Sequence, residues 1–539
     1  MANVGATGGP QRARGLSRLM LRKSVEQIQA ETENSDLKRT LGPLNLVLLG
    51  IGCIIGTGIF VLTGQAAALH AGPGIMISFV ITGTLCGFVA LCYAELAAAV
   101  PVSGSAYSYS YTSMGEFTAW IMGLLLLLEY GLAASTVAVG WSGYLASLMH
   151  DIGWDLPVAL QAAPGVNVLA HGSGEVLGKG VVNLPALIAI AAVTSLLVFG
   201  VSESATVNNV MVFVKVGVVV AFIGIGIFYV NPANWHPLIP PQSPAPPAGS
   251  DMSLGAELWR ALVDVLLARN NSAYGIGGLI TGAATIFFAY IGFEAVSTAG
   301  AEAKNPARDM PIGILGSLVV CTILYILTAA VLVGIVPYTD LNDPAPIAKA
   351  VNQIGLPWFA FVVKLGALAG LSSVMLVLLY GQTRIFYSMA RDGLLPSPFA
   401  ALHAKFKTPW INTIVVGFVA AGFAGFMGLD ALAKLTNIGS LTAFALVCLT
   451  VLYLRIVRPT MHRPFRAPLF PLVPVLGAGM CLFLLMSLMS HRETATFFLV
   501  YVGVGLLIYF AYGMHHSKLA KGELVTGHEP APIDRNHTP

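Results

Sequence analysis

A short glycine-rich stretch interrupts one of the most apolar parts of the chain. It reads GIGCIIGTGIFVLTG over residues 50–64, with four glycines among its first nine residues. Each interior glycine costs an α-helix about 1 kcal/mol relative to alanine, which makes a continuous helix weak there. Unwinding near Gly56, Thr57 and Gly58 would expose N–H groups at the start of one half-helix and carbonyls at the end of the other. The N–H groups favour an anion and the carbonyls a cation, so together they suit a zwitterion.

A second apolar stretch repeats this combination. The string FFAYIGFEAVSTAGAEAKNP, residues 287–306, places Gly292 and the charged Glu294 within its apolar part. Paired interruptions in corresponding segments of two halves predict a transporter built from inverted repeats. Helix packing is the alternative interpretation of the first stretch, because Gly52 and Gly56 also fit the Gly-x-x-x-Gly pattern of close helix contact.

Three ionisable residues lie deep in apolar segments. Glu129 stands in LLLLLEYGLAAS, Lys215 in VMVFVKVGVVVAF, and Glu294 in the second stretch. Each costs about 2.5 to 3.5 kcal/mol on insertion scales, which marks them as candidates for proton coupling. Lys215 could exchange a proton as its access to water alternates, or form a permanent ion pair with either glutamate. Lys364 lies nearer the end of its segment and is expected to extend its amine toward the interface.

Aromatic residues directly precede the second interruption. Phe287, Phe288 and Tyr290 form a cluster there. Most aromatic side chains in such helices pack against their neighbours, but their place beside a broken backbone makes one of them a candidate lid over a substrate.

The composition identifies a membrane protein. Of 539 residues, 56% are hydrophobic and 10% charged, against about 25% charged residues in soluble domains. About twelve apolar runs of about 20 residues predict an all-α polytopic protein embedded in a lipid bilayer. The six cysteines lie in these runs without metal-like spacing, which favours packing over a disulfide or metal site. We expect no cofactor and no nucleic-acid partner.

The distribution of Lys and Arg predicts the topology. The polar, basic residues 1–40 lack the apolar core of a secretory signal, and alternation of the spans places most Lys and Arg on the same side. Both termini are therefore expected in the cytoplasm, with the protein in the cytoplasmic membrane. The expected parts are the basic segment (1–40), a first repeat (41–230), an extracytoplasmic Pro-rich connection (231–276), a second repeat (277–457), two further helices (458–515) and a cytoplasmic tail (516–539).

Five strings occur in order along the chain, namely IGCIIGTGIFVLTG, YAELAAAVPVSGSAYSYSY, ESATVNNVMVFVKVG, FFAYIGFEAVSTAGAEAKNP and YGQTRIFYSMARDGLLP. Together they resemble the amino acid–polyamine–organocation permeases, and within them the bacterial twelve-span form of the cationic amino acid transporter group. The resemblance covers about residues 41–515 and implies a five-plus-five inverted-repeat fold with helices 1 and 6 broken. It also implies transport of L-amino acids by alternating access.

The resemblance also implies site residues. The substrate carboxylate would bind backbone N–H groups at Thr57 and Gly58, and Lys215 matches a lysine that stands where sodium-coupled relatives hold an ion. That match points to proton coupling or sodium-independent exchange. Glu129 and Glu294 fall at acidic positions of the group, although the second is more often Asp. The substrate amino group would bind backbone carbonyls at the positions of Ile54, Phe288, Ala289 and Ile291. Gly292 follows directly and belongs to the same predicted substrate site.

The side chain of the substrate is less constrained by these backbone sites. The group's name suggests arginine and lysine as substrates, and its bacterial members also suggest small neutral amino acids such as alanine. We therefore expect a broad substrate specificity. Glu294 could face a cationic side chain only if proton chemistry leaves it available. An amino acid exchanger and a non-transporting amino acid sensor remain alternative functions. An enzyme is not expected, because the sequence holds no G-x-S-x-G, H-E-x-x-H or P-loop motif. The sequence leaves a small membrane partner or an oligomer open.

Overall fold

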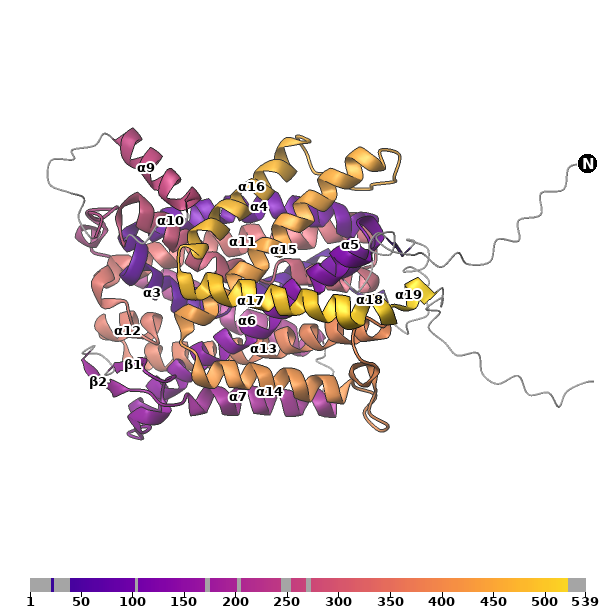
Figure 1. Ribbon diagram of the computed structural model, residues 1–539. Helices are drawn as coiled ribbons and strands as arrows, with labels where there is room; N and C mark the ends of the chain where they lie inside the picture. The colour runs from indigo at the N-terminus through magenta and orange to yellow at the C-terminus, as the bar shows by residue number, and fades with distance from the viewer. Residues whose placement is uncertain are drawn as a thin grey trace, which may run out of the picture.

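The computed structural model shows an almost entirely helical bundle, which confirms the predicted all-α class (Figure 1). Most of the basic segment 1–40, residues 244–253 and 268–272 of the Pro-rich connection, and residues 522–539 of the tail lie outside the described residues. The structure describes residues 21–23, 39–101, 105–169, 175–200, 205–243, 254–267 and 273–521.

The first half of the chain contains one broken helix followed by four helices of 16 to 36 residues, with a small hairpin between the second and the third of these four. The hairpin pairs Asn167 with Lys179 in an antiparallel register, and the sequence did not predict it. The elements are α2 (Pro43–Ile54), η2 (Gly58–Leu62), α3 (Thr63–Ala66), η3 (Ala67–Ala71), η4 (Gly72–Gly74), α4 (Ile75–Ala99), α5 (Ser105–Ser113), α6 (Glu116–Asp151), η5 (Val158–Leu160), β1 (Asn167–Leu169), β2 (Val176–Lys179), α7 (Leu184–Phe199), α8 (Ala205–Gly226), η6 (Ile227–Tyr229) and η7 (Pro232–Trp235).

The second half begins with a short helix outside the bundle and then again enters a broken helix. The elements are α9 (Leu254–Leu266), α10 (Gly275–Ile286), η8 (Phe287–Tyr290), η9 (Glu294–Glu302), α11 (Pro306–Ile335), η10 (Tyr338–Asp340), α12 (Pro346–Gln353), α13 (Pro357–Arg391), η11 (Ser397–Ala400), α14 (Trp410–Phe426), α15 (Leu429–Val457), α16 (Leu472–Met489), α17 (Arg492–Ile508), η12 (Tyr509–Gly513), α18 (Met514–His516) and α19 (Lys518–Lys521).

The described helices have the length and composition of membrane spans. Nine of them could cross a membrane, and α2, α7 and α14 are shorter apolar helices. Large apolar side chains point outward from the bundle, such as Phe213, Phe418 and Leu507 at 65%, 80% and 70% exposure. Such a surface is stable in lipid and not in water. The predicted number of twelve spans and the division into two repeats stay predictions.

The two ends of the described chain meet at one end of the bundle, which we call the terminal end. The Lys23 amine lies 2.6 Å from a carboxylate oxygen of Asp392, and the backbone N–H of Lys518 donates to the carbonyl of Asp392 at 3.1 Å. Figure 1 shows α19 at this end. Both ends of the described chain therefore lie on one side, as an even number of spans requires, and the cytoplasmic assignment of that side stays a prediction.

Lys364 contradicts the expectation that it extends to the interface. Its side chain is 2% exposed, and its amine lies 2.6 Å from a carboxylate oxygen of Asp151 at the end of α6. The amine also donates to the carbonyl of Ser147 at 3.1 Å. The prediction was wrong because Asp151 and Ser147 of the neighbouring helix α6 bind the amine, in place of water and lipid headgroups at the interface.

Glu95 holds the terminal end together from the last turns of α4. Its buried carboxylate accepts hydrogen bonds from Arg455 in α15 and from the backbone N–H of Ala467 at 2.8 Å. Arg463 lies 3.3 Å from the same carboxylate, and its side chain is 5% exposed. One carboxylate thus joins two helices and the connection after α15, and a buried ionic group of this kind depends on every partner.

We expect Glu95→Ala to lower the free energy of unfolding by about 3 kcal/mol or more, because two guanidinium groups lose the carboxylate that they share. Unfolding of the purified protein in detergent micelles measures the change. Asp264→Asn is the matched control, since it removes only the more exposed pair of Asp264 with Arg260 at 3.8 Å. That substitution should cost less than about 0.5 kcal/mol. Equal losses in the two variants would contradict this role of Glu95.

Candidate functional site

The first break lies where the glycine spacing predicts it. Helix α2 ends at Ile54, and Ile55 adopts an extended conformation with φ −72° and ψ 99°. The chain becomes helical again from Thr57, and η2 begins at Gly58. All of these residues are buried, so the opened backbone lies inside the protein. Irregular backbone at membrane depth is tolerated only where protein or a water-filled cavity provides hydrogen bonds.

The second break interrupts the helix that starts with α10. Residues 287–290 form the 3₁₀ turn η8, Ile291 is non-helical with φ −58° and ψ 131°, and Gly292 has φ +120°. The chain then continues as the 3₁₀ helix η9. A side chain at Gly292 would be strained, and its Cβ would lie 2.8 Å from the carbonyl carbon of Cys53. The glycine therefore allows the second break to lie against α2.

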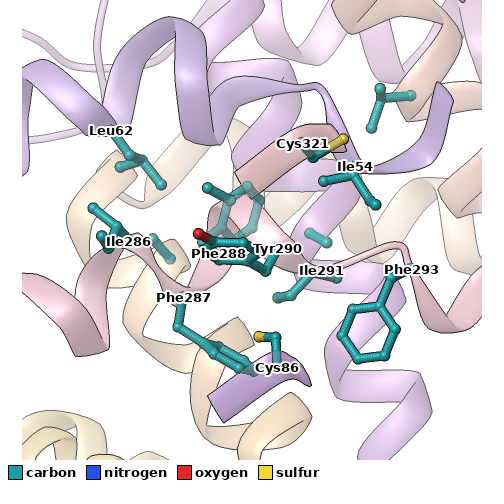
Figure 2. Close-up of a cluster of buried hydrophobic side chains, with 14 of the residues drawn as sticks. Ile54, Leu62, Cys86, Ile286, Phe287, Phe288, Tyr290, Ile291, Phe293 and Cys321 are labelled. Atoms are coloured by element: carbon teal, nitrogen blue, oxygen red, sulfur yellow. The ribbon is translucent and has the colours of Figure 1, made fainter. Parts of the chain in front are cut away.

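The two breaks touch at a second point. A Cβ added to Gly58 would lie 2.2 Å from the Cα of Ala289, closer than any side chain can approach a backbone. Figure 2 shows Ile54 and Leu62 of the first broken helix gathered around Phe288 and Ile291 of the second. The structure thus brings together the residues predicted to bind a substrate, namely Ile54, Gly56, Thr57, Gly58, Phe288, Ala289, Ile291 and Gly292.

Lys215 reaches the first break from α8. Its amine donates to the carbonyl of Gly52 and, at 3.2 Å, to the carbonyl of Ile55. From α11, the Tyr325 hydroxyl donates to the carbonyl of Ile54 at 2.8 Å. The carbonyls at the end of α2 are therefore bound by two side chains from other helices. These contacts place Lys215 on the opened backbone, and the ion pair with a glutamate stays a prediction.

Glu294 stabilises the second break from within. One carboxylate oxygen accepts the backbone N–H of Gly292 at 2.8 Å, and the other lies 3.5 Å from the Tyr130 hydroxyl. Glu129 is the neighbouring carboxyl group, and both glutamates are fully buried. In the described parts of the chain, neither carboxyl oxygen of Glu129 has a hydrogen-bond partner, although Ser440 is also close. The two carboxyl groups form an acidic pair beside the break.

Thr57 carries the one polar side chain of the first break. It is fully buried, and within the described chain its hydroxyl has no hydrogen-bond partner. Its side chain faces α6 at Gly140, where an added Cβ would lie 2.6 Å from the Thr57 methyl group. A buried hydroxyl without a partner costs free energy, so Thr57 is poised to bond a group that enters the site.

The aromatic cluster divides into anchored and unanchored residues. Phe287 packs edge-to-face on Phe444 of α15 at 5.6 Å, and the Tyr290 hydroxyl donates to the carbonyl of Phe79 at 2.9 Å. These two side chains are held in place by packing and hydrogen bonding. Phe288 has 5% exposure and lies at the break itself. It is the member of the cluster that stays a candidate lid.

The far end of the site, opposite the terminal end, is covered by the connection between α11 and α13. Pro346 of α12 lies against Gly64, where an added Cβ would be 2.5 Å from its ring. Pro344 lies against Gly143 of α6 in the same way, at 2.8 Å. Two prolines thus fit against two glycines, and any side chain at either glycine would lift the connection from the bundle.

The terminal end of the site is covered by α5. The Ser105 hydroxyl lies 2.7 Å from the Ser297 hydroxyl of η9, which joins α5 to the part of the second broken helix that follows the break. At the far end, Tyr274 donates its backbone N–H to His70 at 2.7 Å and its hydroxyl to Ala68 at 2.5 Å. The two broken helices are therefore linked to each other and covered at both ends, as an occluded site would be.

Sequence reasoning missed several residues of the site. Tyr130 and Tyr325 contact it through their hydroxyls, and the Asn437 amide donates to the carbonyls of Ala284 and Thr285 at 2.8 and 3.1 Å. A signal was available for Asn437, because a buried amide in the apolar span α15 requires a polar partner. The tyrosines gave no such signal, because tyrosine is frequent in membrane helices.

Comparison with known proteins gives a consistent picture. A family described as amino acid permease matches residues 41–510. A methylthioribose transporter of Bacillus subtilis is 42% identical over 94% of this chain and 100% of the relative. The branched-chain amino acid permease BcaP of the same species is 44% identical over 92% and 98%, respectively. The vacuolar cationic amino acid transporter 4 of Arabidopsis thaliana is 36% identical over 82% and 68%.

We expect Gly58→Ala to lower the free energy of unfolding by about 1–3 kcal/mol, because the new methyl group must push the two breaks apart. Gly56→Ala is the matched control two residues earlier. Its Cβ would meet Val374 at 3.5 Å, an ordinary contact distance. Thermal unfolding of both variants in micelles measures the difference, and a Gly58→Ala variant as stable as Gly56→Ala would show that the breaks are not in close contact.

Proposed function

Because the chain belongs to the amino acid permease family, we propose that it carries neutral apolar L-amino acids across the cytoplasmic membrane together with protons. The family and the relatives identify a multi-pass membrane transporter rather than an enzyme, and they support amino acids as the substrates. The neutral side chain, the proton and the membrane orientation are the parts that we propose.

The observation that carries the proposal is the Thr57 hydroxyl of the first break, which lies against Gly140 of α6 and has no hydrogen-bond partner within the described chain. The hydroxyl and the first N–H groups of the outer half-helix, at Thr57 and Gly58, can donate to a carboxylate. Carbonyls of Ile54, Phe288 and Ala289 can accept from an ammonium group. An α-amino acid carries both groups on one carbon, so it matches donors and acceptors that lie on the two breaks.

The environment of Glu294 favours a neutral substrate side chain. A guanidinium or ammonium group deep in the protein requires a carboxylate or a cluster of carbonyls as its partner. Glu294 already binds the N–H of Gly292, and Glu129 lies next to it rather than on the first break. Buried apolar side chains such as Leu62 and Ile286 lie beside the two breaks (Figure 2). This supports a neutral apolar side chain over arginine or lysine, in line with the branched-chain permease relatives.

Lys215 is the proposed coupling residue. Its amine binds the carbonyls of Gly52 and Ile55, so gain or loss of a proton on Lys215 changes hydrogen bonds at the break itself. The acidic pair of Glu129 and Glu294 is the proposed second proton site, because two adjacent buried carboxyl groups favour sharing one proton. No cofactor is part of this mechanism, in which the proton gradient is the energy source.

We expect proteoliposomes with an inwardly directed proton gradient to accumulate radiolabelled L-leucine and L-alanine, with L-arginine uptake at least about tenfold lower because its charge has no free partner. A sodium gradient alone should drive none of them. Methylthioribose is the control competitor, since it lacks both the carboxylate and the ammonium group. It should leave leucine uptake unchanged.

The outcomes separate the alternatives. Arginine accumulation would contradict the neutral side chain, and sodium-driven uptake would contradict proton coupling. Exchange of preloaded leucine without accumulation identifies an exchanger, and leucine binding without flux identifies a sensor. Inhibition by methylthioribose would show that the site does not require the two charged groups of an amino acid.

We expect Lys215→Met to abolish proton-driven accumulation of leucine and to flatten the pH profile of uptake, because methionine has similar bulk but cannot carry a proton. Lys364→Met is the matched control, since Lys364 is also buried but binds Asp151 and Ser147 away from the breaks. That variant should keep the wild-type pH profile. A Lys215→Met variant with a normal pH profile and normal accumulation would exclude Lys215 from coupling.

A further inference from the structure

Helix α9 presents three different surfaces around its circumference. Successive residues of an α-helix are about 100° apart, so residues three or four apart share a face. On α9 this spacing separates the residues into a buried stripe, a charged stripe and an outward apolar stripe. The buried stripe is Ala261 and Val265, the charged stripe is Glu257, Arg260 and Asp264, and the apolar stripe is Leu258, Trp259, Leu262 and Leu266.

The apolar stripe is the unusual one. Leu258, Trp259 and Leu266 are 47%, 70% and 58% exposed, and Leu267 directly after the helix is 54% exposed. Ala261 and Val265 are 8% and 0% exposed, so the buried stripe packs α9 on the protein, and Leu262 is partly buried beside it. The large apolar side chains therefore do not serve this attachment. Large contiguous apolar patches of this kind mark contact with a membrane or another protein.

The position of α9 indicates which contact it makes. Its packing partners are α10 and α16. Figure 1 shows it at the end of the bundle opposite α19. On α16, Val475, Leu476 and Leu482 are also exposed and belong to the apolar surface that lipid covers. The apolar stripe of α9 thus joins the lipid-facing side of the bundle.

The charged stripe limits how deep the helix can lie. Arg260 and Asp264 form an ion pair at 3.8 Å, and their side chains are 44% and 38% exposed. Charged groups are expensive inside the hydrocarbon region but stable at its boundary. A helix with apolar residues on one side and charged residues on the other lies in the plane of the interface.

We propose that α9 is a membrane-surface helix whose apolar stripe inserts among the lipid acyl chains just below the outer headgroups, with its charged stripe in water. Trp259 at such a boundary matches the enrichment of tryptophan at membrane interfaces. Only residues 267–274 separate α9 from α10, the outer half of the second broken helix. The membrane surface is thereby attached to the start of a helix that lines the site.

Site-directed spin labelling of the full-length protein tests the proposal. Trp259→Cys and Arg260→Cys are neighbours on different stripes, and the native cysteines are all buried. The unsubstituted protein gives the labelling background, and Phe418→Cys on α14 gives the lipid-facing reference. The labelled proteins are reconstituted in phosphatidylethanolamine–phosphatidylglycerol liposomes. Collision rates with oxygen, which partitions into lipid, and with a water-soluble nickel complex are then measured.

At residue 259 we expect more frequent collisions with oxygen than with nickel, as at residue 418, and at residue 260 the reverse. A label at Leu266→Cys should repeat the result of residue 259. High nickel accessibility at both 259 and 266 would place the helix in water and overturn the proposal. Spin–spin broadening at 259 that disappears on dilution with lipid would instead identify a second copy of the chain as the partner, which also overturns it.

Discussion

The structure depends on one constraint, which is that a backbone opened inside a membrane must find its hydrogen bonds within the protein. At the first break, Lys215 and Tyr325 bind carbonyls at the end of α2. At the second break, the carboxylate of Glu294 binds the N–H of Gly292. These side chains come from three different segments, so the breaks are stable only when the surrounding helices are in place.

The contact between the breaks also determines which residues can occupy them. Gly58 lies against the backbone of Ala289, and Gly292 lies against that of Cys53. A side chain at either glycine would separate the half-helices and pull the proposed carboxylate donors away from the proposed ammonium acceptors. The glycines thus weaken each helix while allowing the two helices to form one site. Connections at both ends then shield that site, through α5 on one side and Pro346 on the other.

The sequence predicts the breaks and the buried charges well because both are visible locally. Clustered glycines weaken a helix wherever it packs, and a charge in an apolar run is conspicuous without a structure. The partners could not be predicted in the same way, because they depend on which helices are neighbours. Lys364 illustrates this, since its pairing with Asp151 requires α13 to pack on α6. Tyr325 was missed because nothing in its own segment distinguishes it from a packing residue.

The meeting of the two chain ends at Asp392 has a consequence for biosynthesis. Residues 21–23 leave the ribosome before α13 and α15 do, yet Lys23 contacts Asp392 and Arg22 donates to the Tyr453 hydroxyl at 2.6 Å. These partners are translated hundreds of residues later. Residues 21–23 must therefore stay undocked until the chain has been translated as far as α15, so their docking follows the synthesis of most of the bundle.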